Sequence, residues 1–386
     1  MTQTIEADHQ RISLADRLRA QIKHDGPISF RDWMRAALYD ESEGYYCRRD
    51  IVRWGRLGDY RTAPERTPLF AATFARYFAK LFSELGSPSS WTIIEIGAGF
   101  GEFAAGVLTH LRSSHPEVFA ATRYLIDEIS ADARRQAKVN LSGFEDFFEF
   151  QRLSEIAQTF APAIVFSNEL IDAFPVHRIV MRAGKPRALR VGLNNQNDFA
   201  WVESDLDAPL LAYCERVQLK LAEGQITEVN LHAGEFILRA AALLERGFVI
   251  TVDYGAERDD LLHDPYRRQG TLRASYHHQV TGDVLVEPGR RDLTTTIDWT
   301  EIKEAGQRAG LQTMRLERLD QFLLTEGLLD ELESLTHDVP DDAELLRLRT
   351  GAREMIMPDG MAASFQVLVQ ERKPGSQRPQ GPPPDA

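Results

Sequence analysis

The chain has 386 residues and a formal net charge of −13, because 58 Asp and Glu outnumber 45 Lys and Arg. This charge argues against a nucleic acid partner held through phosphate contacts, and a hydrophobic fraction of 43% supports a sizeable core in one large domain or two smaller ones. Two cysteines provide neither a disulfide framework nor a cysteine-rich metal site, and no apolar run reaches the length of a membrane span. Because the N-terminus also lacks the pattern of a targeting segment, we expect a cytoplasmic protein without a metal or a membrane partner.

Residues 1–85 are predicted to form a mainly helical N-terminal region. Ser13 and Ser29 are suited to cap helices, and Thr67 before a proline is a typical helix start. The segment 44–65 is rich in glycine, proline and charge, which predicts a loop. Its aromatic residues indicate that it packs over another part of the protein.

From residue 86 onward the pattern changes to alternating strands and helices. Such alternation predicts a parallel, doubly wound sheet and hence an α/β fold. The strand candidates are residues 92–97, 123–128, 146–151 and 163–168, and the sheet is expected to resume at 247–255. The segment 374–386 is too rich in proline and polar residues to fold, so we expect a disordered tail after a core that spans 86–373.

The segment 176–246 is predicted to be an insertion between the fourth and fifth strands. Short strands separated by turn signals indicate an antiparallel meander, and two amphipathic helices follow it near 208–222 and 233–245. The second helix is apolar on one face, so it either covers the sheet or forms a homodimer contact. Because chemistry in such folds stays at the strand ends while added elements shape the pocket, we predict that 176–246 faces the substrate and sets specificity.

The most informative stretch is a glycine-rich turn directly after the first strand, with the sequence Glu-Ile-Gly-Ala-Gly-Phe-Gly at 95–101. Gly97, Gly99 and Gly101 allow a tight turn and a close approach of the backbone to a ligand. Their G-x-G-x-G spacing is narrower than the G-x-G-x-x-G of dinucleotide sites. The turn resembles motif I of class I S-adenosylmethionine (SAM) methyltransferases, and a glycine-rich turn without a ligand is the alternative.

A second acidic position follows one crossover later, where the predicted strand 123–128 ends in Asp127 and Glu128. In nucleotide-binding α/β sheets, an acidic side chain at this place accepts hydrogen bonds from the ribose hydroxyls. At least one of the two is expected to be a solvated strand end. The resemblance to SAM methyltransferases favours Glu128 as the ribose ligand.

Several further motifs, in the same order along the chain, resemble the MidA family of SAM-dependent methyltransferases. They lie at residues 26–30, 44–46, 58–65, 95–101, 165–176, 252–255, 270–273 and 292–299. The resemblance implies a Rossmann-like class I methyltransferase sheet and SAM as cofactor. It also implies methylation of an arginine, the reaction of the family's mitochondrial member, which is a complex I assembly factor. The chain departs from the family pattern at several positions, such as Ala98 where proline is common, which leaves the identity of the acceptor open.

The resemblance also implies which residues contact the cofactor. They are Gly58, Asp59, Thr62, Glu65, Glu95, Gly97, Gly99, Gly101, Glu128 and Asn168. The loop that contains the first four of these is expected to fold over the cofactor. A metal is not expected, because the pair His277-His278 has no third ligand at metal spacing.

Methyl transfer to an arginine calls for carboxylates, because the guanidinium stays protonated in proteins and must be oriented so that its charge moves away from the attacking nitrogen. Glu169 and Asp172 form such a pair after the fourth strand, and Asp253 follows the next strand at the same edge of the sheet. We predict these three as catalytic residues. The alternatives are a helix start capped by Asn168 and, for Asp253, a turn residue ahead of Gly255.

Three functions fit these features. The first is a SAM-dependent protein arginine N-methyltransferase of the MidA type, which the acidic pair favours. The second is a SAM-dependent methyltransferase that modifies an oxygen or a nitrogen of a small molecule or peptide. The third is an assembly factor that binds SAM without turnover, which the intact glycines and carboxylates disfavour.

Overall fold

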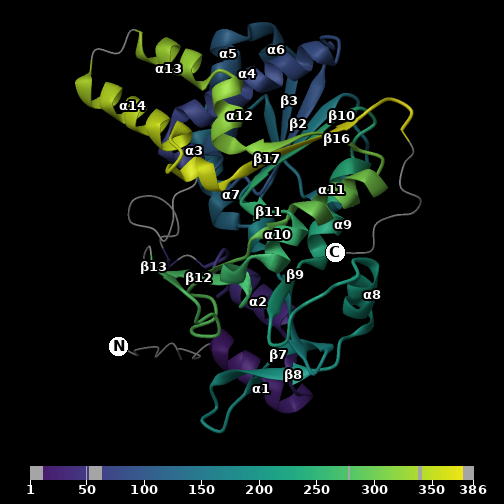
Figure 1. Cartoon of the computed structure of the whole chain (residues 1–386). Coiled ribbons are helices and arrows are strands. Elements are labelled where there is room, and N and C mark those ends of the chain that lie inside the picture. Colours follow the sequence, from purple (N-terminus) through teal and green to yellow (C-terminus); the bar gives the residue numbers. More distant parts are fainter. Residues whose placement is uncertain (1–11, 49, 52–62, 277–278, 338–340, 377–386) are drawn as a thin grey trace, which may run out of the picture.

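The computed structural model describes residues 12–48, 50–51, 63–276, 279–337 and 341–376. Two main sheets organise these residues. The larger one lies in the upper half of Figure 1 and the smaller one in the lower half, and helices pack on both.

Among the described residues, the large sheet has seven strands in the order β16-β17-β10-β5-β2-β3-β4. The strands are β2 (Trp91–Ile96), β3 (Thr122–Asp127), β4 (Phe148–Phe150), β5 (Ala163–Asn168), β10 (Gly247–Asp253), β16 (Gln312–Arg318) and β17 (Gln366–Arg372). Those from β10 to β4 are parallel, whereas β17 runs antiparallel to both β10 and β16. The predicted α/β fold with a parallel sheet is confirmed, and the antiparallel β16–β17 edge is an addition to it.

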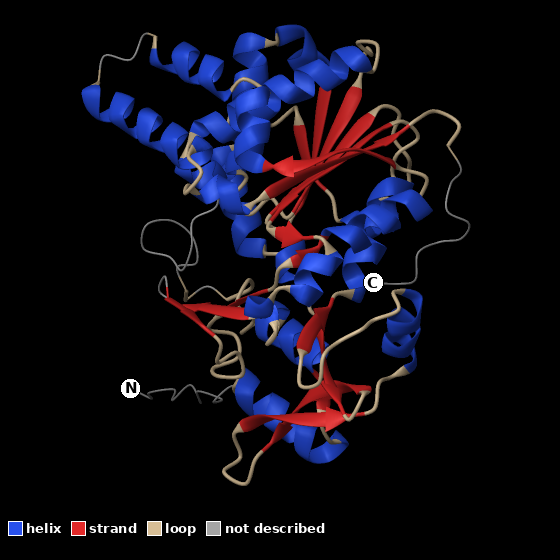
Figure 2. Ribbon diagram, viewed as in Figure 1, coloured by secondary structure: helices blue, strands red, loops and turns tan. Residues whose placement is uncertain are grey.

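Alternate residues of the parallel strands face two different cores, as the two-residue period of a strand requires. Ile93 and Phe166 contribute to the core on one face, and Ile94 and Val165 to the core on the other. The first face is covered by α4 (Pro68–Glu84), α5 (Glu102–Ser114), α12 (Leu319–Thr325), α13 (Leu328–Thr336) and α14 (Asp342–Ile356), and the second by α9 (Leu231–Ala242) and α11 (Trp299–Arg308). Figure 2 shows the large sheet between these helices.

The small sheet is antiparallel and is formed by the insertion together with the N-terminal region. Its strands are β1 (Ile28–Ser29), β6 (His177–Arg182), β7 (Lys185–Leu193), β8 (Phe199–Ser204) and β9 (Ile226–Val229). β7 pairs with β1, β6 and β8, and β9 pairs with β6. The predicted antiparallel meander is therefore confirmed as β6–β7–β8. The helix that follows, α8 (Ala208–Arg216), is shorter than expected, and β9 is not among the predicted strands.

The N-terminal helices divide between the two sheets. Those on the small sheet are α1 (Leu14–Asp25) and α2 (Phe30–Tyr39). Ser13, Ser29 and Thr67 cap α1, α2 and α4, as predicted. However, α4 packs on the large sheet, where the ring of Phe74 meets that of Phe166 edge-on at 5.2 Å. The packing therefore does not follow the predicted boundary after residue 85.

The apolar face of α9 covers the large sheet. Phe236, Ile237, Ala240 and Ala241 are buried in the same core as residues of α11 and β10. Of the two alternatives for this face, the structure shows packing within the chain. The apolar face of α9 is therefore not available for a homodimer contact.

The remaining elements connect these strands and helices. They are α3 (Ala63–Arg66), α6 (Pro116–Ala121), α7 (Ala131–Asn140), α10 (Arg258–His263), β11 (Gly255–Ala256), β12 (Arg273–Tyr276), β13 (Gln279–Thr281), β14 (Asp292–Thr294), β15 (Ile297–Asp298) and the 3₁₀ turns η1 (Leu153–Glu155), η2 (Ile171–Ala173), η3 (Pro265–Arg267) and η4 (Met361–Ser364). Within the described ranges, no helix is both long and apolar enough to cross a membrane. In the same ranges, no group of three His, Cys, Asp or Glu side chains is placed to hold a metal ion.

Candidate active site

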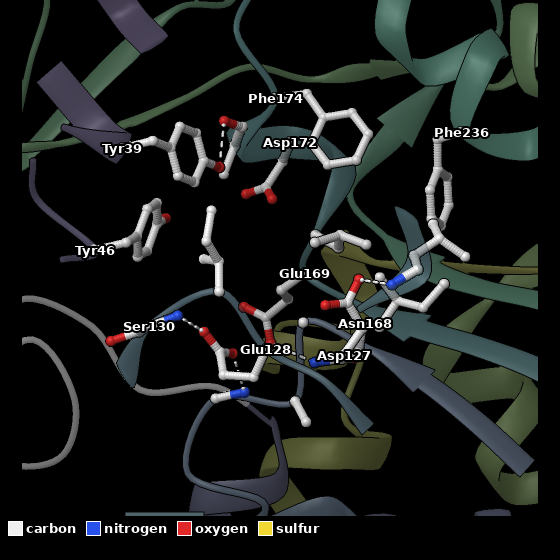
Figure 3. A pocket seen from close by; sticks show the side chains of 18 of the residues that line it. Tyr39, Tyr46, Asp127, Glu128, Ser130, Asn168, Glu169, Asp172, Phe174 and Phe236 are labelled. Carbon is white, nitrogen blue, oxygen red and sulfur yellow. Dashed lines mark hydrogen bonds between the residues drawn. The ribbon is translucent and has the colours of Figure 1, made fainter. Parts of the chain in front are cut away.

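The described residues enclose a cavity of about 660 Å³ at the carboxyl ends of β2, β3 and β5. In an open parallel sheet this edge is where ligands bind, and the volume is typical of a cofactor or small-molecule site. Its side chains come from the glycine-rich turn and the strand ends on one side, and from α2 and α9 on the other. Figure 3 looks into this cavity.

The glycine-rich turn needs glycine for its backbone and for the space beside it. Gly97, Gly99 and Gly101 have φ angles of 76°, 55° and 72°, in the left-handed region that glycine adopts without strain. A Cβ atom on Gly97 would lie 2.8 Å from Leu170, but one on Gly99 would meet no atom of the described residues within 4 Å. Because Gly99 lines the cavity, this open space leaves room for a ligand close to the backbone.

Glu128 joins this turn to the end of β3. Its Oε2 accepts a hydrogen bond from the Gly99 N–H at 2.8 Å, and its Oε1 accepts one from the Ser130 N–H at 2.7 Å. Asp127 instead accepts a hydrogen bond from the Leu153 N–H at 2.9 Å, which anchors the segment after β4. Both carboxylates line the cavity, but Glu128 is the one fixed against the glycine-rich turn. This geometry supports Glu128 as the ribose ligand, a role that stays a prediction.

Glu95 lies near the end of β2, next to the turn, and is almost fully buried. The Tyr124 hydroxyl donates a hydrogen bond to Glu95 Oε2 at 2.7 Å. Burial raises the pKa of Glu95 to about 8, because an ionised carboxylate loses its hydration there. Any contact with the cofactor at neutral pH would therefore be made by a protonated carboxyl group.

We expect Glu95→Gln to change the pH dependence of stability and not the affinity for the cofactor. The folded protein keeps the Glu95 proton up to a pH of about 8, whereas the unfolded chain releases it near pH 4.5, so the native state loses stability as the pH rises between these values. Glutamine resembles the protonated group and should remove up to about 1 kcal/mol of that loss per pH unit. Urea unfolding of both proteins at mildly acidic and mildly alkaline pH measures this effect. If the unfolding free energies of the wild type and Glu95→Gln differ by the same amount at both pH values, the prediction is wrong.

Glu169 follows β5 in a backbone conformation that is unusual for a residue with a side chain. Its φ angle is +50°, and its N–H donates to the Val252 carbonyl oxygen at 2.9 Å. Its Oε1 accepts hydrogen bonds from the Asn168 side-chain amide at 3.2 Å and from the Ala63 N–H at 3.3 Å. Asn168 is thus not the cap of η2, which has no side-chain cap. Strained backbone of this kind is concentrated at functional sites.

Asp172 points into the same cavity from η2 (Figure 3). The residue as a whole is only 5% exposed. Its Oδ2 accepts a hydrogen bond from the Tyr254 hydroxyl at 2.5 Å, whereas its buried Oδ1 has no hydrogen-bond partner among the described residues. Burial raises the pKa of Asp172 to about 6, although the Tyr254 hydroxyl acts to lower it. At neutral pH Asp172 is therefore mostly ionised.

The prediction that Asp253 acts directly in the cavity needs correction. Asp253 is fully buried and is not among the described residues that line the cavity. Its Oδ2 accepts hydrogen bonds from the N–H groups of Ile171 and Asp172 at 3.0 and 3.3 Å, and its Oδ1 accepts one from the Tyr254 N–H at 2.8 Å. Its side chain is therefore turned toward the backbone of η2, where it can hold Asp172 in place but cannot reach a ligand.

Part of the predicted cofactor loop lies outside the described residues. This applies to Gly58, Asp59 and Thr62, whose contacts with the cofactor stay predictions. Glu65 belongs to the short helix α3, and Pro64 of the same helix lines the cavity. The end of the loop therefore reaches the site, while the contact predicted for Glu65 is not tested.

Several residues that the sequence analysis did not assign to the site also line the cavity. Arg31, Arg35 and Tyr39 recur every four residues along α2, which puts them on one face of the helix. The Arg31 Nε donates to the His232 Nε2 at 2.8 Å, and the His232 Nδ1 lies 3.1 Å from a Glu235 carboxylate oxygen. The spacing on α2 is visible in the sequence, but the contact of Arg31 with α9 spans 201 residues and is not.

Two tyrosine rings form one side of the cavity near Asp172. The rings of Tyr39 and Tyr46 stack with their centroids 5.5 Å apart. The Tyr39 hydroxyl donates to the Ala173 carbonyl oxygen at 3.0 Å, and the Tyr46 hydroxyl donates to Asp292 Oδ1 at 2.7 Å. The stacked rings are thus fixed beside η2 on one side and β14 on the other.

Comparison with known proteins identifies the family. The model of the family Methyltransf_28, S-adenosyl-L-methionine-dependent methyltransferases, matches residues 73–316. The chain belongs to this family. It is a SAM-dependent methyltransferase, and the resemblance to MidA-type methyltransferases is confirmed.

Relatives of this methyltransferase cover most of the chain. The Drosophila melanogaster protein named protein arginine methyltransferase NDUFAF7 homolog, mitochondrial, is 26% identical and aligns with 92% of this chain and 84% of its own. The Homo sapiens protein of the corresponding name is 24% identical over 91% of this chain and 82% of its own. A solved COG1565 superfamily member from Burkholderia thailandensis, bound to S-adenosyl-homocysteine, is 29% identical with a TM-score of 0.82 and covers 95% of this chain and 93% of its own. Because S-adenosyl-homocysteine is SAM without its methyl group, the predicted cofactor is confirmed.

The prediction of a cytoplasmic location is wrong by the same comparison. The matched NDUFAF7 relatives are named as mitochondrial proteins. Acidity and a low cysteine content suit any reducing aqueous compartment, so these features could not distinguish one compartment from another.

Proposed function

We propose that this methyltransferase transfers the methyl group to an arginine side chain of a protein. The observation that carries the proposal is the pair Glu169 and Asp172, whose side chains point into one cavity beside the glycine-rich turn (Figure 3). The names of the NDUFAF7 relatives as protein arginine methyltransferases support the same acceptor.

The residues of the chain fit the cofactor. Gly97 and Gly99 would lie beside it, because the space next to Gly99 is open, and Glu128 would accept hydrogen bonds from the ribose hydroxyls. The buried Asn168 Oδ1 has no hydrogen-bond partner among the described residues, so it is available to a donor group of the ligand. When bound, SAM supplies an electrophilic methyl group on a sulfonium that is a good leaving group.

The two carboxylates suit a guanidinium acceptor. A protonated guanidinium is a poor nucleophile until its charge is drawn away from the attacking nitrogen. Asp172, ionised above its pKa of about 6, can accept a hydrogen bond from the acceptor through Oδ1 and take up the proton that the nitrogen loses as its bond to the methyl carbon forms. Glu169 can accept a second N–H of the same planar group.

The stacked rings of Tyr39 and Tyr46 support a flat, cationic acceptor. Aromatic faces attract cations, and arginine stacks on them more readily than an aliphatic amine does. Both rings line the cavity next to Asp172, so a guanidinium could meet an aromatic face and a carboxylate together.

A small molecule or peptide is the second candidate acceptor. Arg31 and Arg35 line the cavity on α2, and such side chains would suit an acceptor that carries an anionic group. Attack by an oxygen or another nitrogen would then replace attack by a guanidinium.

A labelling experiment distinguishes the two candidates. The purified protein is incubated with SAM labelled on its methyl group and with an extract of cells from which its gene has been deleted. Label that enters protein, and that is recovered as methylarginine after acid hydrolysis, supports the proposal. Label confined to the small-molecule fraction overturns it. The Asp172→Asn variant serves as the control for label transferred by other enzymes.

We further propose that the insertion 176–246 contributes to acceptor recognition through α9. His232, Glu235, Phe236 and Arg239 of this helix line the cavity, whereas none of the described residues of β6, β7 or β8 does. Glu235→Gln should therefore raise the acceptor concentration needed for half-maximal rate by several-fold, because Glu235 holds His232 and, through it, Arg31.

Shortening the exposed turn at 194–198, between β7 and β8, is the matched control and should leave that concentration unchanged. If shortening the turn weakens methylation and Glu235→Gln does not, recognition belongs to the meander instead.

A further inference from the structure

We propose that Tyr254, assisted by Arg273, is a positioning residue that keeps Asp172 ionised and leaves one of its oxygens directed to the acceptor. This inference rests on the proposed role of Asp172 and extends it to two residues outside the carboxylate pair.

Tyr254 and its neighbour Asp253 hold Asp172 from two directions. Asp253 Oδ2 accepts hydrogen bonds from the N–H groups of Ile171 and Asp172, which fixes the backbone of η2. The Tyr254 hydroxyl donates to Asp172 Oδ2 at 2.5 Å, which fixes the side chain. With Oδ2 occupied, Oδ1 is the oxygen left for an acceptor, and it has no hydrogen-bond partner among the described residues.

The ring of Tyr254 is itself held in place. The ring of Phe365 meets it edge-on, with the centroids 5.4 Å apart. The guanidinium carbon of Arg273 lies 5.1 Å from the centroid of the Tyr254 ring. Burial raises the pKa of the Tyr254 phenol well above its usual range, so the hydroxyl keeps its proton and remains a donor to Asp172 at every pH of interest.

Burial opposes the ionisation of Asp172, whereas the Tyr254 hydroxyl, the charge of Arg273 and backbone groups of Asp172 and Ala173 favour it. Asp253 on β10 and Glu169 after β5 lie close to Asp172. Burial and the charges of Asp172 and of Asp292 on β14 raise the pKa of the Tyr39 hydroxyl on α2. Burial and the charge of Asp172 raise the pKa of Asp253 well above its usual range, which favours the negative charge of this pair on Asp172. The Tyr254 hydroxyl and the positive charge of Arg273 both lower the pKa of Asp172.

Removing the hydroxyl should therefore make Asp172 harder to ionise. Tyr254→Phe keeps the ring and its contacts but deletes the donor, so we expect the pKa of Asp172 to rise by about one unit or more from its value of about 6. Arg273→Gln should raise it in the same direction by a smaller amount, and Arg273→Lys should restore it, because lysine keeps the charge.

The test uses the full-length protein labelled with ¹³C at the aspartate side-chain carboxyl carbons. The pH titration of these carbons is followed by NMR, and the signal missing from Asp172→Asn identifies Asp172. Tyr77→Phe is the matched control, because Tyr77 is a buried tyrosine with an arginine, Arg315, 5.9 Å from its ring centroid. Tyr77 belongs to a different core from Ile171 of η2. The control should leave the midpoint of Asp172 unchanged.

Two outcomes decide the proposal. An upward shift in Tyr254→Phe, with S-adenosyl-homocysteine affinity retained as a check on folding, supports it. An unchanged midpoint, or an equal shift in Tyr77→Phe, overturns it. The titration needs no methyl acceptor. The arginine proposal can therefore fail in the labelling experiment while the titration supports the role of Tyr254, and the role of Tyr254 can fail while methylarginine is found.

Discussion

Asp172→Asn is expected to lower the rate of methyl transfer by about 100-fold or more, while the affinity for S-adenosyl-homocysteine changes little. Asparagine keeps the shape of the side chain, and its oxygen can still accept a hydrogen bond from the Tyr254 hydroxyl. It cannot take up a proton or draw positive charge toward itself, so the loss falls on the chemical step. Single-turnover rates with saturating cofactor, together with calorimetry of S-adenosyl-homocysteine, measure the two effects separately.

Glu169→Gln is also expected to lower the rate of methyl transfer, since it removes the second carboxylate from the cavity. A purely structural role makes the opposite forecast, in which stability falls by about 1 kcal/mol and the rate of the folded enzyme is unchanged. Asp320→Asn is the matched control, because Asp320, like Asp172, is 5% exposed but is paired with Arg318 away from the cavity. If all three variants lose stability and keep their rates, Glu169 and Asp172 belong to the structure and not to the chemistry.

The same role for Asp172 fixes the pH dependence of the wild-type rate. If Asp172 has the proposed role, its carboxylate is the active form, and because its pKa is about 6 the rate should fall as the pH drops through about 6 and should level off above it. This acid limb should be absent from the residual activity of Asp172→Asn. A limb that persists in that variant would assign the titration to another group.

The features that the sequence predicted best are those set by neighbours along the chain. The glycine-rich turn requires positive φ at Gly97, Gly99 and Gly101, and a glycine at alternate positions after a strand indicates that requirement. The caps Ser13 and Ser29 are equally local, because the capping hydrogen bond reaches only to Asp16 and Asp32. The alternation of strands and helices is likewise a pattern of neighbouring residues, and it predicts the parallel sheet.

The parts that could not be predicted from the sequence depend on contacts between distant segments. The sequence places Asp253 at the ligand edge because it ends a strand there, but a strand end can turn its side chain either to the ligand or to the backbone of a neighbouring segment. The structure shows the second arrangement, with Asp253 bound to the N–H groups of Ile171 and Asp172. The contact of Tyr254 with Asp172 spans 82 residues, and no local pattern encodes it.

Gly99→Val is expected to raise the dissociation constant for S-adenosyl-homocysteine by about 100-fold or more, which corresponds to about 2.8 kcal/mol. Gly99 has a φ angle of 55° and lines the cavity, and the open space beside it is the room that a cofactor would occupy. A branched side chain there fills that space and also disfavours the backbone conformation that presents the Gly99 N–H to Glu128. Calorimetry on the purified variant measures the loss.

A control variant must separate the effect of backbone strain in Gly99→Val from the effect of filling the space beside the turn. Gly184 has a φ angle of 72°, and among the described residues no atom lies within 4 Å of a Cβ placed on it, as is also true of Gly99. Gly184, however, lies in the turn between β6 and β7 and does not line the cavity. Gly184→Val should therefore cost the same roughly 1–3 kcal/mol of stability as Gly99→Val and leave the affinity for S-adenosyl-homocysteine intact. If both variants melt at lower temperature but only Gly99→Val loses binding, the open space beside Gly99 belongs to the cofactor. If Gly99→Val binds as tightly as the wild type, the cofactor does not pass close to this turn, and the proposed position of the cofactor beside Gly97 and Gly99 is wrong.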